Sequence, residues 1–122
     1  MIKEVITIDG EESVAEACKI MGEKHIGSLI VTSQSKPIGI FTERDLLSKI
    51  ILKRLKLDEI KVKDYTSMPL TVISPEFDLK EAARIMAQLK IRRLPVMKGE
   101  KLVGILTSAD ITSALASSPL DF

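Results

Sequence analysis

The sequence predicts an α+β fold built from two β-α-β-β-α repeats related by a pseudo-twofold axis. Three observations support this prediction. Shifting the chain by 65 residues aligns positions 5–46 with 70–111 without a gap, and 14 of these 42 positions are identical. Both copies show the same order of apolar periodicities. Both also end in a similar corner, "GIFTERD" in the first and "GILTSAD" in the second. Two copies favour a closed pair over a solenoid.

Each copy begins with a short β segment, residues 5–8 or 70–73. A helix-start signal follows, because Ser13 and Asp78 each have a glutamate three positions later, as in a capping box. The next segment places apolar residues on one stripe, which predicts an amphipathic helix in each copy.

A hairpin follows the helix in each copy, and its strands are expected at 28–32 and 37–41, and at 93–97 and 102–106. Thr42 and Thr107 then open the last helix of each copy. Neither copy alone covers both faces of so small a sheet, so packing the two together would bury the apolar faces.

The charged segment between the copies ends in proline and is predicted to join them. We therefore expect the first repeat at 1–55, a linker at 56–65, the second repeat at 66–118 and a tail at 119–122. Basic residues near the linker, such as Lys53 and Arg54, are expected on a solvated helix face, since no aromatic residues are interleaved for base stacking.

Composition excludes several classes of protein. The chain has 122 residues, of which 45% are apolar and 29% charged, so it should be globular. A net charge of +1 gives no global argument for nucleic acid or an anionic membrane. One cysteine and one histidine cannot form a Cys/His zinc site, and Cys18 is expected in the core. Without a signal peptide or a spanning segment, the protein is expected to be cytoplasmic.

Catalysis is not expected. The lone His25 lies in a different segment from any serine of interest, and it is expected to end a helix or lie on the surface, with ligand contact as the alternative. The Asp and Glu residues form no cluster beyond the two repeated aspartates, and the sequence contains no P-loop.

The duplicated unit, the segments "HIGSLIV" and "KIRRLPV" before the hairpins, and the two G-I-x-T-x-x-D corners resemble a tandem pair of CBS domains, or Bateman module. The resemblance covers nearly the whole chain and implies a regulatory module of the stand-alone type. Members of this family bind adenine nucleotides or adenosyl compounds between the repeats. The resemblance therefore implies AMP, ADP or ATP as the ligand, no required cofactor, a homodimer, and an unidentified protein regulated in trans.

The resemblance also implies ligand-binding residues, because each cleft combines the Thr/Asp corner of one repeat with the first strand and helix–strand turn of the other. Site one is expected to contain Thr42, Asp45, Leu70, Thr71, Ile91, Arg92 and Arg93. Site two is expected to contain Thr107, Asp110, Val5, Ile6, Ile26, Gly27 and Ser28. The aliphatic side chains would enclose the adenine.

The residue types at each corner support two compatible interpretations. In the first, threonine and aspartate form a capping box that satisfies only their own helix. In the second, the helix N-terminus and the threonine hydroxyl bind a phosphate, and the aspartate accepts both hydroxyls of a ribose. A guanidinium suits phosphate better than the hydroxyl of Ser28, so Arg92 and Arg93 predict tighter phosphate binding at site one. The alternative for both arginines is a solvated surface pair.

The leading functional hypothesis is a non-catalytic sensor of adenine nucleotides that signals to a partner protein. The alternatives are a constitutive dimerisation or interaction protein with vestigial sites, an S-adenosylmethionine binder and a nucleic-acid binder. A nucleic-acid binder would show salt-dependent binding to oligonucleotides.

Overall fold

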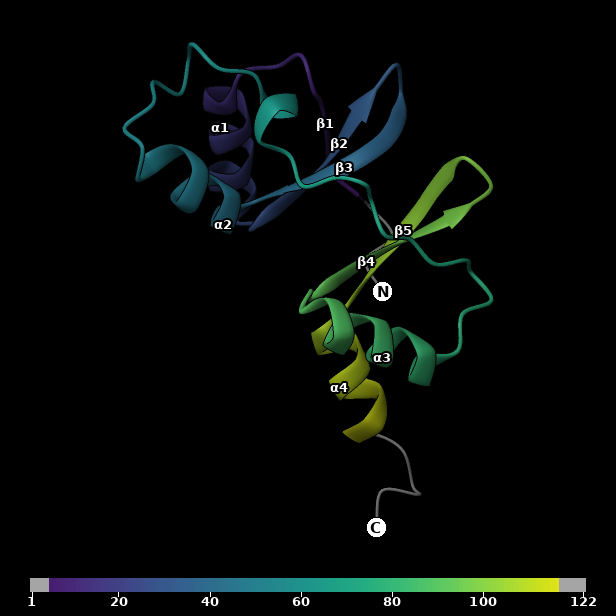
Figure 1. Ribbon diagram of the computed structural model, residues 1–122. Coiled ribbons are helices and arrows are strands. Elements are labelled where there is room, and N and C mark those ends of the chain that lie inside the picture. Colours follow the sequence, from purple (N-terminus) through teal and green to yellow (C-terminus); the bar gives the residue numbers. More distant parts are fainter. Residues whose placement is uncertain (1–4, 117–122) are drawn as a thin grey trace. The chain divides into compact units, whose positions relative to one another are not determined.

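A computed structural model describes residues 5–116, and the side chains of residues 5–114. Within this range the chain forms two compact units (Figure 1). The first unit is Ile6–Leu70, and the second contains Val5 together with the described residues from Thr71 onward. Each unit combines helices with a small sheet, so the α+β fold of two similar repeats is confirmed.

The first unit contains a three-stranded sheet in the order β1-β2-β3. β1 (Thr7–Asp9) runs parallel to β2 (Ser28–Ser33), and β2 forms an antiparallel hairpin with β3 (Lys36–Thr42). Leu29 lies opposite Phe41 in this hairpin, so their side chains share one face of the sheet. Both are almost completely buried, and this face forms the core of the unit.

Helix α1 (Val14–Lys24) packs against this core through Val14, Ala17 and Met21. Ser13 is its N-cap, as predicted, and the Ser13 hydroxyl accepts a hydrogen bond of 3.1 Å from the Glu16 N–H. The helix ends at His25, which adopts a left-handed conformation with φ of 55° and lies exposed. This position agrees with the prediction that His25 terminates the helix.

The last helical segment of the first repeat changes its hydrogen-bond pattern after one turn. α2 (Glu43–Asp45) continues as a π-helix, η1 (Leu46–Ile51), and the Leu52 N–H donates to the Leu47 carbonyl at 3.1 Å. The Ser48 hydroxyl donates to the Arg44 carbonyl at 2.7 Å, which is the acceptor that the Ser48 N–H would use in an α-helix.

The segment that follows η1 packs into the first unit. It contains the 3₁₀-helix η2 (Val62–Tyr65), and the Val62 side chain is fully buried in the core. The Val62 N–H donates to the Glu12 carbonyl at 2.9 Å, and the Lys63 N–H donates to the Gly10 carbonyl at 3.0 Å. The exact domain boundaries stay a prediction, but much of the expected linker belongs to the body of the first unit.

The second unit contains α3 (Leu79–Leu89), the antiparallel hairpin of β4 (Arg93–Lys98) and β5 (Lys101–Thr107), and α4 (Ser108–Ala116). Asp78 is the N-cap of α3, as predicted, although its carboxylate accepts from the Lys80 N–H at 2.9 Å. The core consists of Ala82, Met86, Leu94, Val96, Leu106 and Ile111. None of the helices in the described range is long and apolar enough to cross a membrane.

The predicted strand at 70–73 is wrong. Ile73 alone forms a bridge to β4, where its N–H donates to the Pro95 carbonyl at 3.0 Å. In the first repeat, the Ile30 N–H donates to the Ile6 carbonyl at 3.4 Å, and the 65-residue shift relates these two residues to Pro95 and Thr71. Pro95 replaces Ile30 and has no N–H, so the matching bond to Thr71 cannot form and the pairing stops at a single bridge.

Candidate functional site

The first corner consists of Thr42 and Asp45, where β3 passes into α2. The Thr42 N–H donates to Asp45 Oδ2 at 3.0 Å, and the Asp45 N–H donates to Thr42 Oγ1 at 3.2 Å. The Thr42 hydroxyl also donates to Asp45 Oδ2 at 3.0 Å. The predicted capping box is therefore confirmed at this corner.

Two further donors hold the Asp45 carboxylate, which is buried. Lys49 Nζ lies 2.8 Å from Asp45 Oδ1, one helical turn further along the chain. The Ser67 hydroxyl, 22 positions away, donates to Asp45 Oδ1 at 3.1 Å and lies 3.4 Å from Oδ2. Neither Lys49 nor Ser67 was among the predicted site residues, although the i,i+4 spacing of Asp45 and Lys49 is a readable signal. No sequence spacing pointed to Ser67.

The second corner consists of Thr107 and Asp110, where β5 passes into α4. The Thr107 N–H donates to Asp110 Oδ2 at 2.8 Å, and the Thr107 hydroxyl donates to the same atom at 2.9 Å. The Asp110 N–H donates to Thr107 Oγ1 at 3.1 Å, which completes a second capping box. The backbone hydrogen bond from Thr107 lowers the pKa of Asp110 below its usual value, so the carboxylate is charged at neutral pH.

Each corner lies beside the helix–strand turn of its own repeat. Ser28 is opposite Thr42 in the β2–β3 ladder, and Arg93 is opposite Thr107 in the β4–β5 ladder. Opposed residues of an antiparallel pair share one face of the sheet, so Arg93 lies on the same face as Thr107. The Ser108 N–H also donates to the Arg92 carbonyl at 2.9 Å. Within their own repeat, the arginines therefore adjoin the second corner, which the sequence prediction did not consider.

The other predicted site residues are divided between the units. Leu70 belongs to the unit that contains the first corner, and Val5 belongs to the unit that contains the second corner. The remaining predicted partners of each corner lie in the other unit: Thr71, Ile91, Arg92 and Arg93 for the first corner, and Ile6, Ile26, Gly27 and Ser28 for the second. The cross-repeat combinations stay a prediction.

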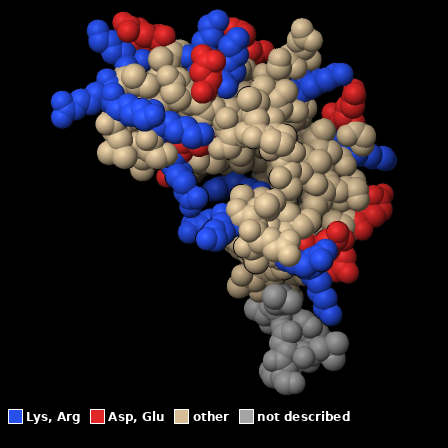
Figure 2. Space-filling model, viewed as in Figure 1, with Lys and Arg blue, Asp and Glu red and all other residues tan. Residues whose placement is uncertain are grey.

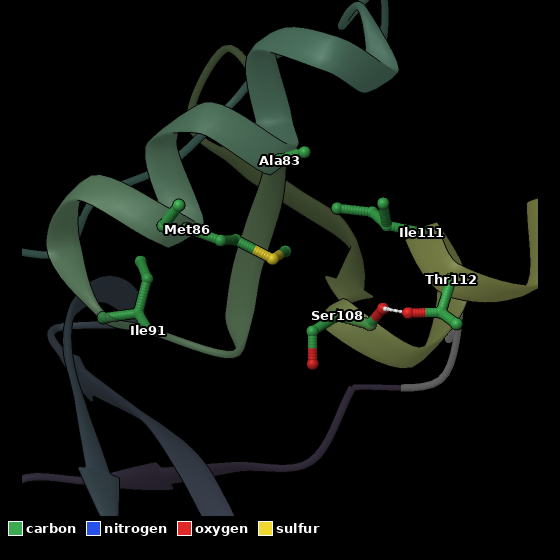
Figure 3. A pocket seen from close by; sticks show the side chains of 7 residues that line it. Ala83, Met86, Ile91, Ser108, Ile111 and Thr112 are labelled. Carbon is green, nitrogen blue, oxygen red and sulfur yellow. Dashed lines mark hydrogen bonds between the residues drawn. The ribbon is translucent and has the colours of Figure 1, made fainter. Parts of the chain in front are cut away.

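A shallow pocket of about 290 Å³ lies between α3 and α4 of the second unit (Figure 3). Its lining residues are Ala83, Met86, Ala87, Ile91, Ser108, Ile111 and Thr112. Ile91 is among the predicted ligand-binding residues, and Ser108 directly follows Thr107 of the second corner. The Thr112 hydroxyl donates to the Ser108 carbonyl at 3.1 Å, so it already has a partner within the helix. The wall of the pocket is mainly apolar, because all its lining residues except Ser108 and Thr112 are aliphatic or methionine.

The charged and metal-ligating groups of residues 5–114 indicate no metal centre. Within the described range, no three His, Cys, Asp or Glu side chains are grouped so that they could hold a metal ion. Basic and acidic side chains are both spread over the face shown in Figure 2. Cys18, which was expected in the core, is only half-buried and packs against the first core from its edge, and burial raises the pKa of its thiol.

Known proteins share both the sequence and the fold. A family model of the CBS domain matches residues 1–52 and 62–117. Uncharacterized protein MK0525 of Methanopyrus kandleri is 36% identical over 111 residues, which cover 89% of this chain and 57% of that protein. A CBS-domain protein from Burkholderia ambifaria MC40-6 has a TM-score of 0.88 at 27% identity, with coverage of 96% of this chain and 86% of that chain.

The hexameric CBS-CP12 protein from bloom-forming cyanobacteria is also similar, with a TM-score of 0.86 at 36% identity, covering 98% of this chain and 72% of that chain. This chain spans between 31% and 61% of the length of the first four curated relatives that it matches. The family model, in contrast, matches both repeats over most of the chain. The chain therefore belongs to the CBS-domain family, and its two repeats form a tandem pair of CBS domains.

Proposed function

We propose that this CBS domain pair is a non-catalytic regulatory module that binds an adenine nucleotide, AMP, ADP or ATP, and signals to a partner protein. The observation that carries the proposal is the Thr/Asp corner, which is built twice with the same capping-box geometry. Each corner places a threonine hydroxyl, a carboxylate and the N-terminus of a helical segment together. These groups match the phosphate and ribose of one nucleotide.

The family resemblance implies a ligand bound between the repeats, with aliphatic side chains enclosing the adenine. Signalling then follows from linkage. A nucleotide between the repeats shifts their packing only by the difference in its affinity for the two arrangements. The cytoplasm is the proposed location, since adenine nucleotides are abundant there.

The helix–strand turns of the two repeats differ in charge, with Gly27 and Ser28 in the first and Arg92 and Arg93 in the second, which supports a preference between phosphorylated and non-phosphorylated adenosyl ligands. A guanidinium fork binds phosphate oxygens well. Arg93 is half-buried and adjoins the second corner within its repeat, whereas the family resemblance assigns it to the first site. Either assignment makes Arg93 a phosphate-binding residue and distinguishes AMP from adenosine or S-adenosylmethionine.

A thermal-shift panel with AMP, ADP, ATP, NAD and S-adenosylmethionine tests the proposal. A ligand at a hundredfold over its dissociation constant should stabilise the fold by about 2.7 kcal/mol. Asp45→Ala should reduce the thermal shift for a ligand bound at the first corner, and Asp110→Ala should reduce it for a ligand bound at the second corner. Because Asp45 is buried and accepts from several donors, its loss also lowers the stability of the apo protein. The measured quantity is therefore the difference with and without ligand within each variant.

Calorimetric titration of Arg93→Ala completes this experiment. We expect AMP affinity to fall while adenosine affinity stays unchanged, since only the phosphate meets the guanidinium. Arg84→Ala, which removes an exposed arginine of α3, is the matched control and should change neither affinity. Absence of a thermal shift with every adenine compound would instead support a constitutive interaction protein.

We further propose that the chain self-associates as a homodimer. The hexameric CBS-CP12 relative supports self-association of this fold. So do exposed large apolar side chains on and after η1, namely Leu47 at 58%, Ile51 at 47% and Leu52 at 78% exposure. Sedimentation velocity should give a dimer for the wild type, and Leu52→Lys should shift it towards monomer. A monomer at all concentrations would disprove this part of the proposal.

A further inference from the structure

The backbone around Ser67 is docked on the first corner's strand. The Ser67 N–H donates to the Ile40 carbonyl at 2.9 Å, and the Ile40 N–H donates to the Ser67 carbonyl at 3.1 Å. Gly39 makes this approach possible, since a Cβ at this position would lie 2.5 Å from Thr66 Cγ2 and 2.6 Å from the Ser67 carbonyl oxygen. The segment that leads to the second repeat is therefore held directly against β3.

The Ser67 side chain adds a bond to the residue proposed to receive the ribose. An ionised carboxylate offers about four lone-pair sites to donors. At Asp45 these sites face four groups: the Thr42 N–H, the Thr42 hydroxyl, the Lys49 ammonium and the Ser67 hydroxyl. A ribose diol brings further donors, so it must compete with the present ones and displace at least one of them to bind Asp45.

Ser67 is the donor that can leave most easily. Thr42 is fixed by the capping box, and the Lys49 ammonium carries a charge that compensates the buried carboxylate. The Ser67 hydroxyl is neutral, lies in an exposed residue, and makes a bond of 3.1 Å that water can replace. The structure thus contains a neutral, displaceable group on the proposed ribose acceptor.

We propose that Ser67 is an internal competitor for Asp45, so that nucleotide binding at the first corner displaces the Ser67 hydroxyl and loosens residues 66–68 from β3. This inference rests on the proposed nucleotide binding. It identifies a route from the ligand to the chain segment that continues into the second repeat, because the same residue contacts Asp45 and Ile40.

Titration of AMP into Ser67→Ala tests this proposal, in an Asp110→Ala background that leaves the first corner as the remaining Thr/Asp corner. Removing a competing hydrogen bond should tighten AMP binding, by roughly three- to tenfold. Ser33→Ala is the matched control, since it removes an exposed hydroxyl at the end of β2 and should leave the affinity unchanged. Adding Asp45→Ala to the Ser67→Ala variant should abolish the gain.

Hydrogen exchange provides a second measurement on the wild-type chain. The Ser67 and Ile40 amides should exchange faster when AMP is bound, because the displaced segment loses its pairing to β3. An unchanged or weaker AMP affinity in Ser67→Ala would overturn the competition while leaving nucleotide binding intact. If neither the wild type nor any variant binds AMP or the other adenine nucleotides, the proposed function itself fails, and the competitor role fails with it.

Discussion

His25 and Lys90 occupy equivalent positions in the two repeats, and each ends the first helix of its repeat in a left-handed conformation. Their φ values are 55° and 56°, and their N–H groups donate to the Met21 and Met86 carbonyls. A residue with a Cβ pays roughly 1–2 kcal/mol in this region, which is why glycine is preferred there. Both helix ends therefore keep a local strain that the capping bond offsets.

Replacing His25 by glycine should consequently stabilise the protein. The gain from relieving the left-handed strain exceeds the entropy that glycine adds to the unfolded chain, so we expect up to about 1 kcal/mol. Urea unfolding monitored by circular dichroism measures the change. His25→Ala is the control, because alanine keeps the Cβ and should give no gain. An equal gain for both variants would assign the effect to the imidazole and not to the backbone.

At the scale of elements, local signals in the sequence predicted most of the fold. The first-repeat strand expected at 28–32 is observed at Ser28–Ser33, and Ser13 and Asp78 are the N-caps of α1 and α3. These features depend on periodicity and on residues three or four apart, which are visible in a single sequence. The 65-residue repeat strengthened these predictions, because each signal occurs twice.

Elements that depend on distant partners could not be predicted in this way. The expected strand at 70–73 fails because Pro95, on β4, lacks the N–H that Ile30 supplies in the first repeat. The sequence showed this proline, but the effect appears only once the two segments are paired. The π-helical bonding of η1 was also not predicted from the sequence.

The candidate site shows the same division. The corner residues and their capping boxes were predicted correctly, because Thr and Asp are three positions apart. The bond between Ser67 and Asp45 joins residues 22 positions apart and left no signal in the sequence. The proximity of Arg93 to Thr107 required the register of the β4–β5 hairpin, which places them opposite each other.

At the scale of the whole chain, a small ion-pair cluster adds to the buried Val62 and the backbone hydrogen bonds that hold residues 61–63 to the first unit. The Glu11 carboxylate accepts from Lys61 Nζ and Lys63 Nζ, each at 2.6 Å. The bonds from Lys61 and Lys63 lower the pKa of Glu11 from 4.5 to about 2, and the bond to Glu11 raises the pKa of Lys63. The cluster is exposed, so salt should screen it.

The contribution of this cluster to the free energy of unfolding should therefore depend on pH. The pKa shifts of Glu11 and Lys63 set the direction of this dependence. The contribution of Glu11 is fully present above pH 4.5, its unperturbed value, and is lost as the pH falls towards about 2. The contribution of Lys63 is present below pH 10.5 and is lost as the pH rises beyond that value. Between these limits the cluster should contribute a constant amount.

Thermal unfolding of the wild type and Glu11→Gln between pH 5 and pH 2 measures the acid limb of this dependence. Glutamine keeps the size of the side chain but cannot ionise, so the Tm of the variant should fall less steeply with acid. The difference between the two proteins should shrink in about 1 M NaCl, where the Debye length is about 3 Å. Parallel acid profiles at low salt would mean that the Glu11 cluster does not help to hold residues 61–63 against the first unit.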